Sequence, residues 1–306
     1  MARYGGIFPG QGAQLVGMGR DVAEKYSVAA ETFAEADEVL GLPVARLCFE
    51  GPAERLNATD IQQPAIFTTS VALFRAALDA GRFRSGDFGA LGGLSLGEYT
   101  ALHLAGAVSF ADGLRLVARR GQLMQQAAEH GAGGMVSLMG GDEAQVLALC
   151  ERVAEHGRVR PANYNCPGQI VISGDKAACE AAAGLSSEFG LRAVALPVAG
   201  AFHSELMRSA AEGLRPVLEG CDFRTPAIRV IANVSAEYHT DPVAIRALLY
   251  RQVVSPVRWQ ACVERLMADG CNEFWEVGPN RHLTGMMRKI DRQAKVTNVS
   301  TVGDMQ

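Results

Sequence analysis

The 306-residue sequence lacks any run of about 18 apolar residues that could span a membrane, and its first residues lack the apolar core of a signal peptide. Its seven cysteines are scattered and never spaced as C-x-x-C, which argues against a disulfide framework and a zinc site. The formal net charge of −4 argues against a general nucleic-acid binder. We therefore expect a cytoplasmic protein with no membrane, nucleic-acid or metal partner.

The sequence does contain a serine within Gly93-x-Ser95-x-Gly97, between a short apolar run and a helix-like segment. This is the pattern of a nucleophile elbow, a sharp turn that exposes a serine at the end of a strand. A serine hydroxyl is a weak nucleophile and needs an adjacent base and nearby backbone N–H donors. Small glycine-rich turns are common, so the pattern alone leaves a purely structural turn open.

The order of the apolar segments predicts an α/β fold in which a large α/β-hydrolase-like domain, with a mainly parallel sheet, is interrupted once. Strands and helices alternate before residue 130 and after residue 198, which favours a parallel sheet covered on both faces. Between them, residues 131–197 follow the order βαββαβ, which predicts a small ferredoxin-like subdomain. Strands are expected at 4–8, 135–139, 159–164, 169–173, 192–197, 228–233 and 273–277.

Two of the six histidines stand in settings suitable for the base. His282 follows a predicted strand late in the chain, where an ordinary serine hydrolase of this architecture would carry its histidine. His203 lies in a loop of small residues directly after the predicted insert. The sequence pattern alone does not show which of these two histidines is the base. We expect the others to be solvated: His103, His130, His156 and His239.

Several motifs in one order resemble the malonyl-CoA:acyl carrier protein transacylase family, and the resemblance covers nearly the whole chain. They are Phe8-Pro-Gly-Gln-Gly-Ala-Gln14, Gly-x-Ser95-Leu-Gly-Glu98-Tyr, Arg120-Gly-x-x-Met, Asn165-x-Pro-Gly-Gln169, Ala201-Phe-His203-Ser, Ala232-Asn-Val-Ser-Ala236, Gln252-x-x-x-Pro256-Val-x-Trp259 and Glu276-Val-Gly-Pro279. Any one could arise by chance. The resemblance implies transfer of a malonyl group from a CoA thioester to the thiol of acyl carrier protein, by a monomer without a bound cofactor.

The resemblance also implies roles for residues of the catalytic centre. Ser95 would be the nucleophile and His203 the general base, which leaves His282 a structural or surface residue. The backbone carbonyl of Gln252 would orient the imidazole in place of a carboxylate. Backbone N–H groups of Gln11 and Leu96 would form the oxyanion hole.

Four further residues would bind the substrate. Arg120 would hold the malonyl carboxylate, because its planar fork makes two charge-assisted bonds that lysine or glutamine could not reproduce. Gln63 would help to position the acyl group, and Asn165 would also contact the substrate. Phe202, beside the base, would limit bulk at the acyl α-carbon.

The chain departs from the family pattern at Leu94, where the family usually has histidine before the nucleophile. This residue borders the acyl pocket, so its replacement bears on acyl selectivity. Two alternatives remain: a thioester hydrolase with the same Ser-His dyad, which would have no use for Arg120, and a non-catalytic docking module. For the carrier protein, which is acidic, we expect a basic docking surface that includes Arg281, Arg288 and Lys289.

Overall fold

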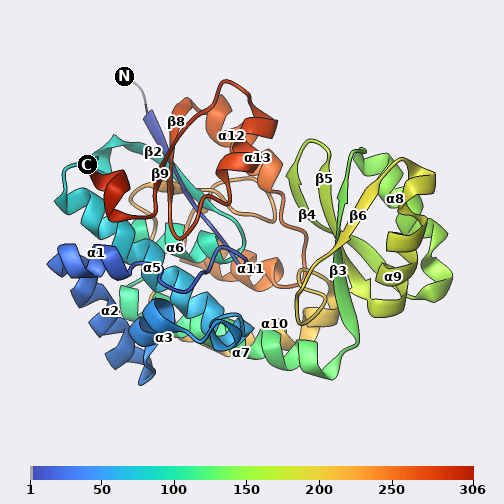
Figure 1. Ribbon diagram of the computed structural model, residues 1–306, viewed down its shortest axis with the longest axis horizontal. Helices are drawn as coiled ribbons and strands as arrows, with labels where there is room; N and C mark the ends of the chain where they lie inside the picture. The colour runs from blue at the N-terminus through green and yellow to red at the C-terminus, as the bar shows by residue number, and fades with distance from the viewer. Residues whose placement is uncertain (1–2) are drawn as a thin grey trace.

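The computed structural model describes residues 3–306 and contains a parallel sheet and a separate antiparallel sheet (Figure 1). The parallel sheet has the strand order β7-β2-β1-β8-β9, and every pairing in it is parallel. Its strands are β1 (Arg3–Phe8), β2 (Phe88–Gly93), β7 (Arg229–Val230), β8 (Cys271–Val277) and β9 (Lys295–Val299). The predicted α/β class with a mainly parallel sheet is confirmed.

Helices cover both faces of the parallel sheet (Figure 1). The helices around this sheet are α1 (Arg20–Lys25), α2 (Ser27–Leu40), α3 (Val44–Glu50), α4 (Ala53–Leu56), α5 (Thr59–Asp79), α6 (Leu96–Leu104), α7 (Phe110–His130), α10 (Arg208–Gly220), α11 (Pro242–Gln252), α12 (Trp259–Ala268) and α13 (Thr284–Ile290). Adjacent residues of β1 enter different cores, because side chains of a strand alternate between its faces. Phe8 belongs to a cluster with residues of α2, α5 and α7, whereas Ile7 belongs to a cluster with residues of α12 and α13.

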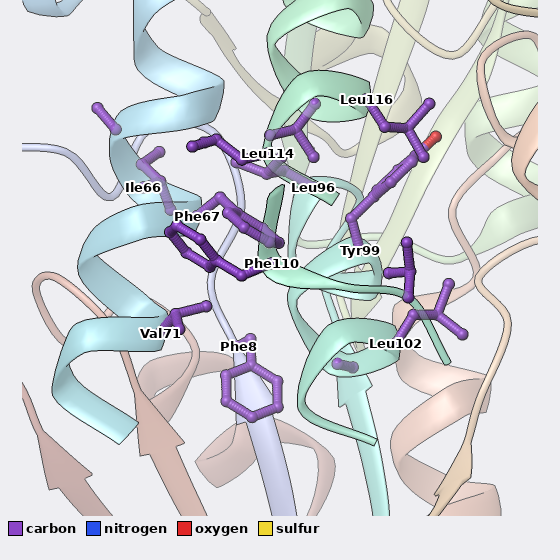
Figure 2. Packing of buried hydrophobic residues seen from close by; sticks show 14 of the residues in the cluster. Phe8, Ile66, Phe67, Val71, Leu96, Tyr99, Leu102, Phe110, Leu114 and Leu116 are labelled. Carbon is purple, nitrogen blue, oxygen red and sulfur yellow. The ribbon is translucent and has the colours of Figure 1, made fainter. Parts of the chain in front are cut away.

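Helices α5 and α7 form the core of the first face, and Figure 2 shows their side chains packed beside the nucleophile elbow. The rings of Phe67 and Phe110 are stacked with centroids 5.7 Å apart, and Leu96, the first residue of α6, belongs to the same cluster. Ser109 caps the N-terminus of α7, since its hydroxyl accepts a hydrogen bond from the amide of Asp112 at 3.0 Å. This packing fixes the elbow against two long helices.

The antiparallel sheet is built in the predicted order βαββαβ and lies to one side of the parallel sheet (Figure 1, green to yellow). Its strand order is β4-β5-β3-β6, with α8 (Glu143–Arg152) and α9 (Lys176–Leu185) packed on one face. The strands are β3 (Gly133–Met139), β4 (Val159–Cys166), β5 (Gln169–Asp175) and β6 (Arg192–Ala195). The predicted ferredoxin-like arrangement is therefore confirmed.

Two local predictions need correction. The strand expected at 228–233 contains only β7, because the chain turns after Ile231 and the amide of Asn233 donates to a buried carboxylate. Helix α13 and strand β9 were not predicted. None of the helices within residues 3–306 has the length and apolar character needed to cross a membrane.

Candidate active site

Ser95 lies on the sharp turn between β2 and α6, as the elbow pattern predicts. Its backbone has φ 52° and ψ −100°, a strained conformation for a residue with a side chain. The turn needs glycine at two positions: a Cβ on Gly93 would lie 1.9 Å from the carbonyl carbon of Gly97, and one on Gly97 would lie 2.1 Å from the oxygen of Phe8. The glycines thus let the strand, the turn and the helix approach closely.

His203 lies beside the nucleophile, with its Nε2 2.8 Å from the Oγ of Ser95. Its Nδ1 lies 2.8 Å from the backbone carbonyl oxygen of Gln252. A carbonyl only accepts, so Nδ1 carries a proton and, in the neutral ring, Nε2 is free to accept the serine proton. Burial, and then the nearby Arg120 cation, lower the pKa of His203 to about 4, so the ring is neutral near pH 7. This is the protonation state of a general base.

Arg120 is almost fully buried, with 1% of its surface exposed, and its guanidinium points at the nucleophile. It donates hydrogen bonds to Gln63 Oε1 at 2.7 Å, Ser95 Oγ at 3.0 Å and Gln252 Oε1 at 3.1 Å. The guanidinium carbon lies 5.1 Å from the centre of the Tyr99 ring. Within residues 3–306, Arg120 forms no ion pair with a carboxylate, and its Nε has no hydrogen-bond partner. Burial lowers the pKa of Arg120, but arginine stays charged in proteins.

A buried network behind the nucleophile was missed from the sequence. The carboxylate of Glu98 accepts hydrogen bonds from the backbone amide of Asn233 at 2.9 Å and from Gln252 Nε2 at 2.7 Å. Its other oxygen lies 2.8 Å from Nε2 of His239. The Gln252 side chain also donates to the backbone oxygen of Ser95, at 3.0 Å. Glu98 therefore ties the segment that orients the imidazole to the elbow.

The sequence offered only a weak signal for this network. Glu98 is a charged residue on an otherwise small and apolar helix, one turn after Ser95, but its partners lie 135 to 154 residues further along the chain. The prediction that His239 is solvated is wrong, because it is 5% exposed and bonded to Glu98.

The remaining histidines differ in their surroundings. His130 and His156 are exposed, as predicted. His103 is half-buried and its Nδ1 lies 3.0 Å from the carbonyl oxygen of Val108, so the prediction that it is solvated is wrong; burial lowers its pKa to about 4. His282 forms no hydrogen bond with Ser95 but lines the same cavity, so it is more than a surface residue.

A cavity of about 140 Å³ opens next to Ser95 and His203. Its wall includes Gln11, Asn165 and Phe202, so the structure brings these predicted site residues together. The rest of the wall is mostly apolar: Leu94, Met124, Met135, Asn163, Val171, Leu196, Val198, His282 and Met286.

Of the remaining predicted residues, Leu96 is buried at the start of α6, where the first amides of a helix have no intrahelical acceptor. Gln63, Arg120 and Gln252 join the nucleophile through the hydrogen bonds described above. Residues 3–306 contain no cluster of three or more His, Cys, Asp or Glu side chains arranged to hold a metal ion.

A serine on an elbow, bonded to a neutral imidazole within an α/β fold, is an arrangement suited to acyl transfer. The family model described as "Acyl transferase domain" matches residues 7–306, and the chain is an acyltransferase. The malonyl CoA-acyl carrier protein transacylase of Bacillus subtilis (strain 168) is 43% identical over 302 residues, which cover 98% of this chain and 94% of the relative. That of Escherichia coli (strain K12) is 43% identical over 291 residues, covering 95% and 93%. The chain belongs to the malonyl-CoA:acyl carrier protein transacylase family.

Solved structures agree with this assignment. The acyl carrier protein S-malonyltransferase of Vibrio cholerae has a TM-score of 0.94 and 42% identity, and the match covers 99% of each chain. A malonyl-transacylase solved in complex with a type II PKS acyl-carrier protein has a TM-score of 0.95 and 39% identity, covering 99% of this chain and 98% of that one.

Proposed function

We propose that this chain transfers the malonyl group of malonyl-CoA to the phosphopantetheine thiol of an acyl carrier protein, through a malonyl ester of Ser95. The observation that carries the proposal is the buried guanidinium of Arg120, which lacks a carboxylate partner among residues 3–306 and lies 3.0 Å from the nucleophile. A buried charge is normally paired, because its lost hydration must be offset. A carboxylate on the acyl group supplies the missing partner.

The first half-reaction moves the acyl group from sulfur to oxygen. His203 Nε2 takes the proton of the Ser95 hydroxyl while its oxygen attacks the thioester carbonyl. The backbone N–H groups of Gln11 and Leu96 stabilise the oxyanion that forms. When the intermediate collapses, the carbon–sulfur bond breaks and the leaving CoA sulfur takes the proton from the imidazolium.

The second half-reaction reverses these roles. The carrier thiol gives its proton to His203, and its sulfur attacks the ester carbonyl. The ester carbon–oxygen bond then breaks, and the Ser95 oxygen recovers the proton. The Gln252 carbonyl keeps the imidazole in one tautomer throughout, since Nδ1 always donates to it.

The acyl pocket selects a short acid-bearing chain. Neither Arg120 nor Gln63 is among the residues that line the cavity, but Arg120 donates to the Ser95 hydroxyl at its edge and to Gln63 at 2.7 Å. These two residues would form the polar end of the acyl pocket. Phe202 is buried in the cavity wall and limits bulk at the acyl α-carbon, while Asn165 contacts the substrate from the opposite subdomain. A hydrolase could use the same Ser-His dyad, but it would have no use for Arg120, so transfer is the better account.

The predicted division of the chain remains part of this proposal. Residues 131–197 form a subdomain inserted between residues 1–130 and 198–306. The active-site cavity takes its wall from both parts, which supports a substrate cleft between them. The enzyme would work as a cytoplasmic monomer without a bound cofactor.

The carrier protein would dock beside this cleft on a basic surface that includes Arg281, Arg288 and Lys289. All three side chains are exposed, but Arg281 already pairs with Asp304 at 3.1 Å, so the helix residues Arg288 and Lys289 have more charge to offer. Charge complementarity of this kind speeds association at low salt.

The test is to incubate the protein with malonyl-CoA and measure its intact mass, with and without carrier protein. We expect the mass of a malonyl adduct on the wild type, none on Ser95→Ala, and loss of the adduct to the carrier. Release of free malonate at the same rate with and without carrier would favour the hydrolase.

A further inference from the structure

Two polar residues from different units line the active-site cavity together with Ser95. Asn165 belongs to β4 of the inserted unit, and His282 precedes α13 of the large unit. Figure 1 shows α13 beside β4, and the two elements are in contact. A molecule that reaches Ser95 through this cavity therefore meets a polar group from each unit.

The side-chain oxygen of Asn165 is a hydrogen-bond acceptor without a partner. The residue is 6% exposed, and its Oδ1 is buried and forms no hydrogen bond within residues 3–306. Leaving such a group unpaired typically costs about 1–3 kcal/mol. The unpaired oxygen therefore indicates a ligand that donates an N–H or O–H to it.

His282 supplies a hydrogen-bond donor to the same cavity. It is half-buried, and neither ring nitrogen forms a hydrogen bond or an ion pair within the described residues 3–306. Burial lowers the pKa of His282, while the Glu276 carboxylate raises it. The neutral ring carries one N–H donor. Its neighbours in the cavity wall, Leu94 and Met286, are apolar, so the donor is left for a ligand.

We propose that Asn165 and His282 together bind the secondary amide of the pantetheine arm, the amide that lies two carbons from the sulfur. The Oδ1 of Asn165 accepts the amide N–H, and the His282 ring donates to the amide carbonyl. A secondary amide offers one donor and one acceptor, which matches a cavity lined by an unpaired acceptor from the inserted unit and a free donor from the large unit. This inference rests on the proposed function, because that function brings a pantetheine thioester to Ser95.

The test uses three small malonyl thioesters that differ only in the arm. One is the thioester of N-acetylcysteamine, which carries the amide. The second is that of 2-mercaptoethyl acetate, which keeps the carbonyl but replaces N–H with oxygen. The third is that of pentanethiol, which has neither. The measured quantity is kcat/KM for formation of malonyl-Ser95, with kcat and KM separated, and ratios between substrates cancel any loss of folded protein.

For the wild type we expect the order amide, then ester, then alkyl. Asn165→Ala should lower the amide-to-ester ratio about 3–10-fold, because it removes the acceptor of the N–H. His282→Leu should lower the ester-to-alkyl ratio by a similar factor, mainly through KM, because it removes the donor to the carbonyl. His282→Gln retains a side-chain N–H and should recover part of this loss. His130→Leu, a change of an exposed histidine outside the cavity wall, should leave both ratios as in the wild type.

Unchanged ratios in Asn165→Ala and His282→Leu would overturn the inference, as would equal losses on all three thioesters, which would mean that these side chains only support the fold. Failure of the wild type to form malonyl-Ser95 from any thioester would instead overturn the proposed function. The two failures are therefore distinguishable.

Discussion

Arg120 donates a hydrogen bond to the hydroxyl oxygen of Ser95 across 3.0 Å, from within helix α7 to the turn that precedes α6. Together with burial, the same cation lowers the pKa of the neighbouring His203. One buried charge therefore acts on both the nucleophile and the base. This coupling sets what each substitution at the site should do.

Replacing the base should slow both half-reactions, because the same imidazole accepts a proton from serine and later from the incoming thiol. We expect His203→Ala to lower the rate of Ser95 acylation about 10²–10⁴-fold. His282→Ala should lower this rate far less, because the hydrogen bond to the Ser95 hydroxyl comes from His203 and not from His282. Rapid-quench measurement of malonyl-enzyme formation compares the two variants. If His282→Ala proves the more damaging, the base has been assigned wrongly.

Removing the buried cation should change acyl selectivity. In Arg120→Ala the malonyl carboxylate enters the pocket without its partner, at a cost of about 3–5 kcal/mol. The ratio of kcat/KM for malonyl-CoA to that for acetyl-CoA should then fall by roughly two to three orders of magnitude. Arg119→Ala, a change of the exposed neighbour on the same helix, is the matched control. An unchanged ratio in Arg120→Ala would place this residue outside the acyl pocket.

The pH dependence of acylation should report the low pKa of His203. Because burial and the Arg120 cation lower this pKa to about 4, the ring stays neutral, and the base active, well below pH 6.5. In Arg120→Ala the protonated ring is no longer repelled, so its pKa rises and the acid limb moves to higher pH. Single-turnover acylation by acetyl-CoA between pH 4 and 8 measures the limb without a charged acyl group. An acid limb at the same pH in both proteins would contradict this coupling.

The buried carboxylate of Glu98 should contribute to both stability and positioning. Glu98→Leu removes the oxygen that accepts hydrogen bonds from both the Asn233 amide and Gln252 Nε2. Both buried N–H groups lose this acceptor, so the free energy of unfolding should fall by at least about 1–3 kcal/mol. Urea unfolding measures this free energy. Glu237→Leu, at an exposed ion pair with Arg265, should change it by less than about 1 kcal/mol, and equal losses in the two variants would contradict the role of the network.

The sequence predicted the class of fold because predicted strands and helices alternate along the chain. A layered α/β structure buries the apolar residues of both. It also predicted the βαββαβ order of the second unit, since its turns and helices are short and locally encoded. The short strand β7 was overpredicted: the Ile231 amide still donates to Leu91 of β2, but the chain then turns and Asn233 bonds to Glu98 and Ser95. Strand β9 was missed at the edge of the sheet, where most of its residues are exposed or half-buried and the apolar pattern is weak.

By itself, the sequence determined which residues are chemically equipped for acyl transfer: the elbow serine, a histidine between small residues and an arginine within a helix. Those features are local, and the order of the motifs carries the resemblance to the family. The residues alone left His203 and His282 open as the base, and the resemblance favoured His203. Only the tertiary structure brings His203 Nε2 to 2.8 Å from Ser95 Oγ, because the distance between residues 108 positions apart depends on how their segments pack. It also decided that Glu98 and His239 pair 141 residues apart and that Arg120 is buried beside Ser95, since these contacts arise only when the helices and the two sheets pack together.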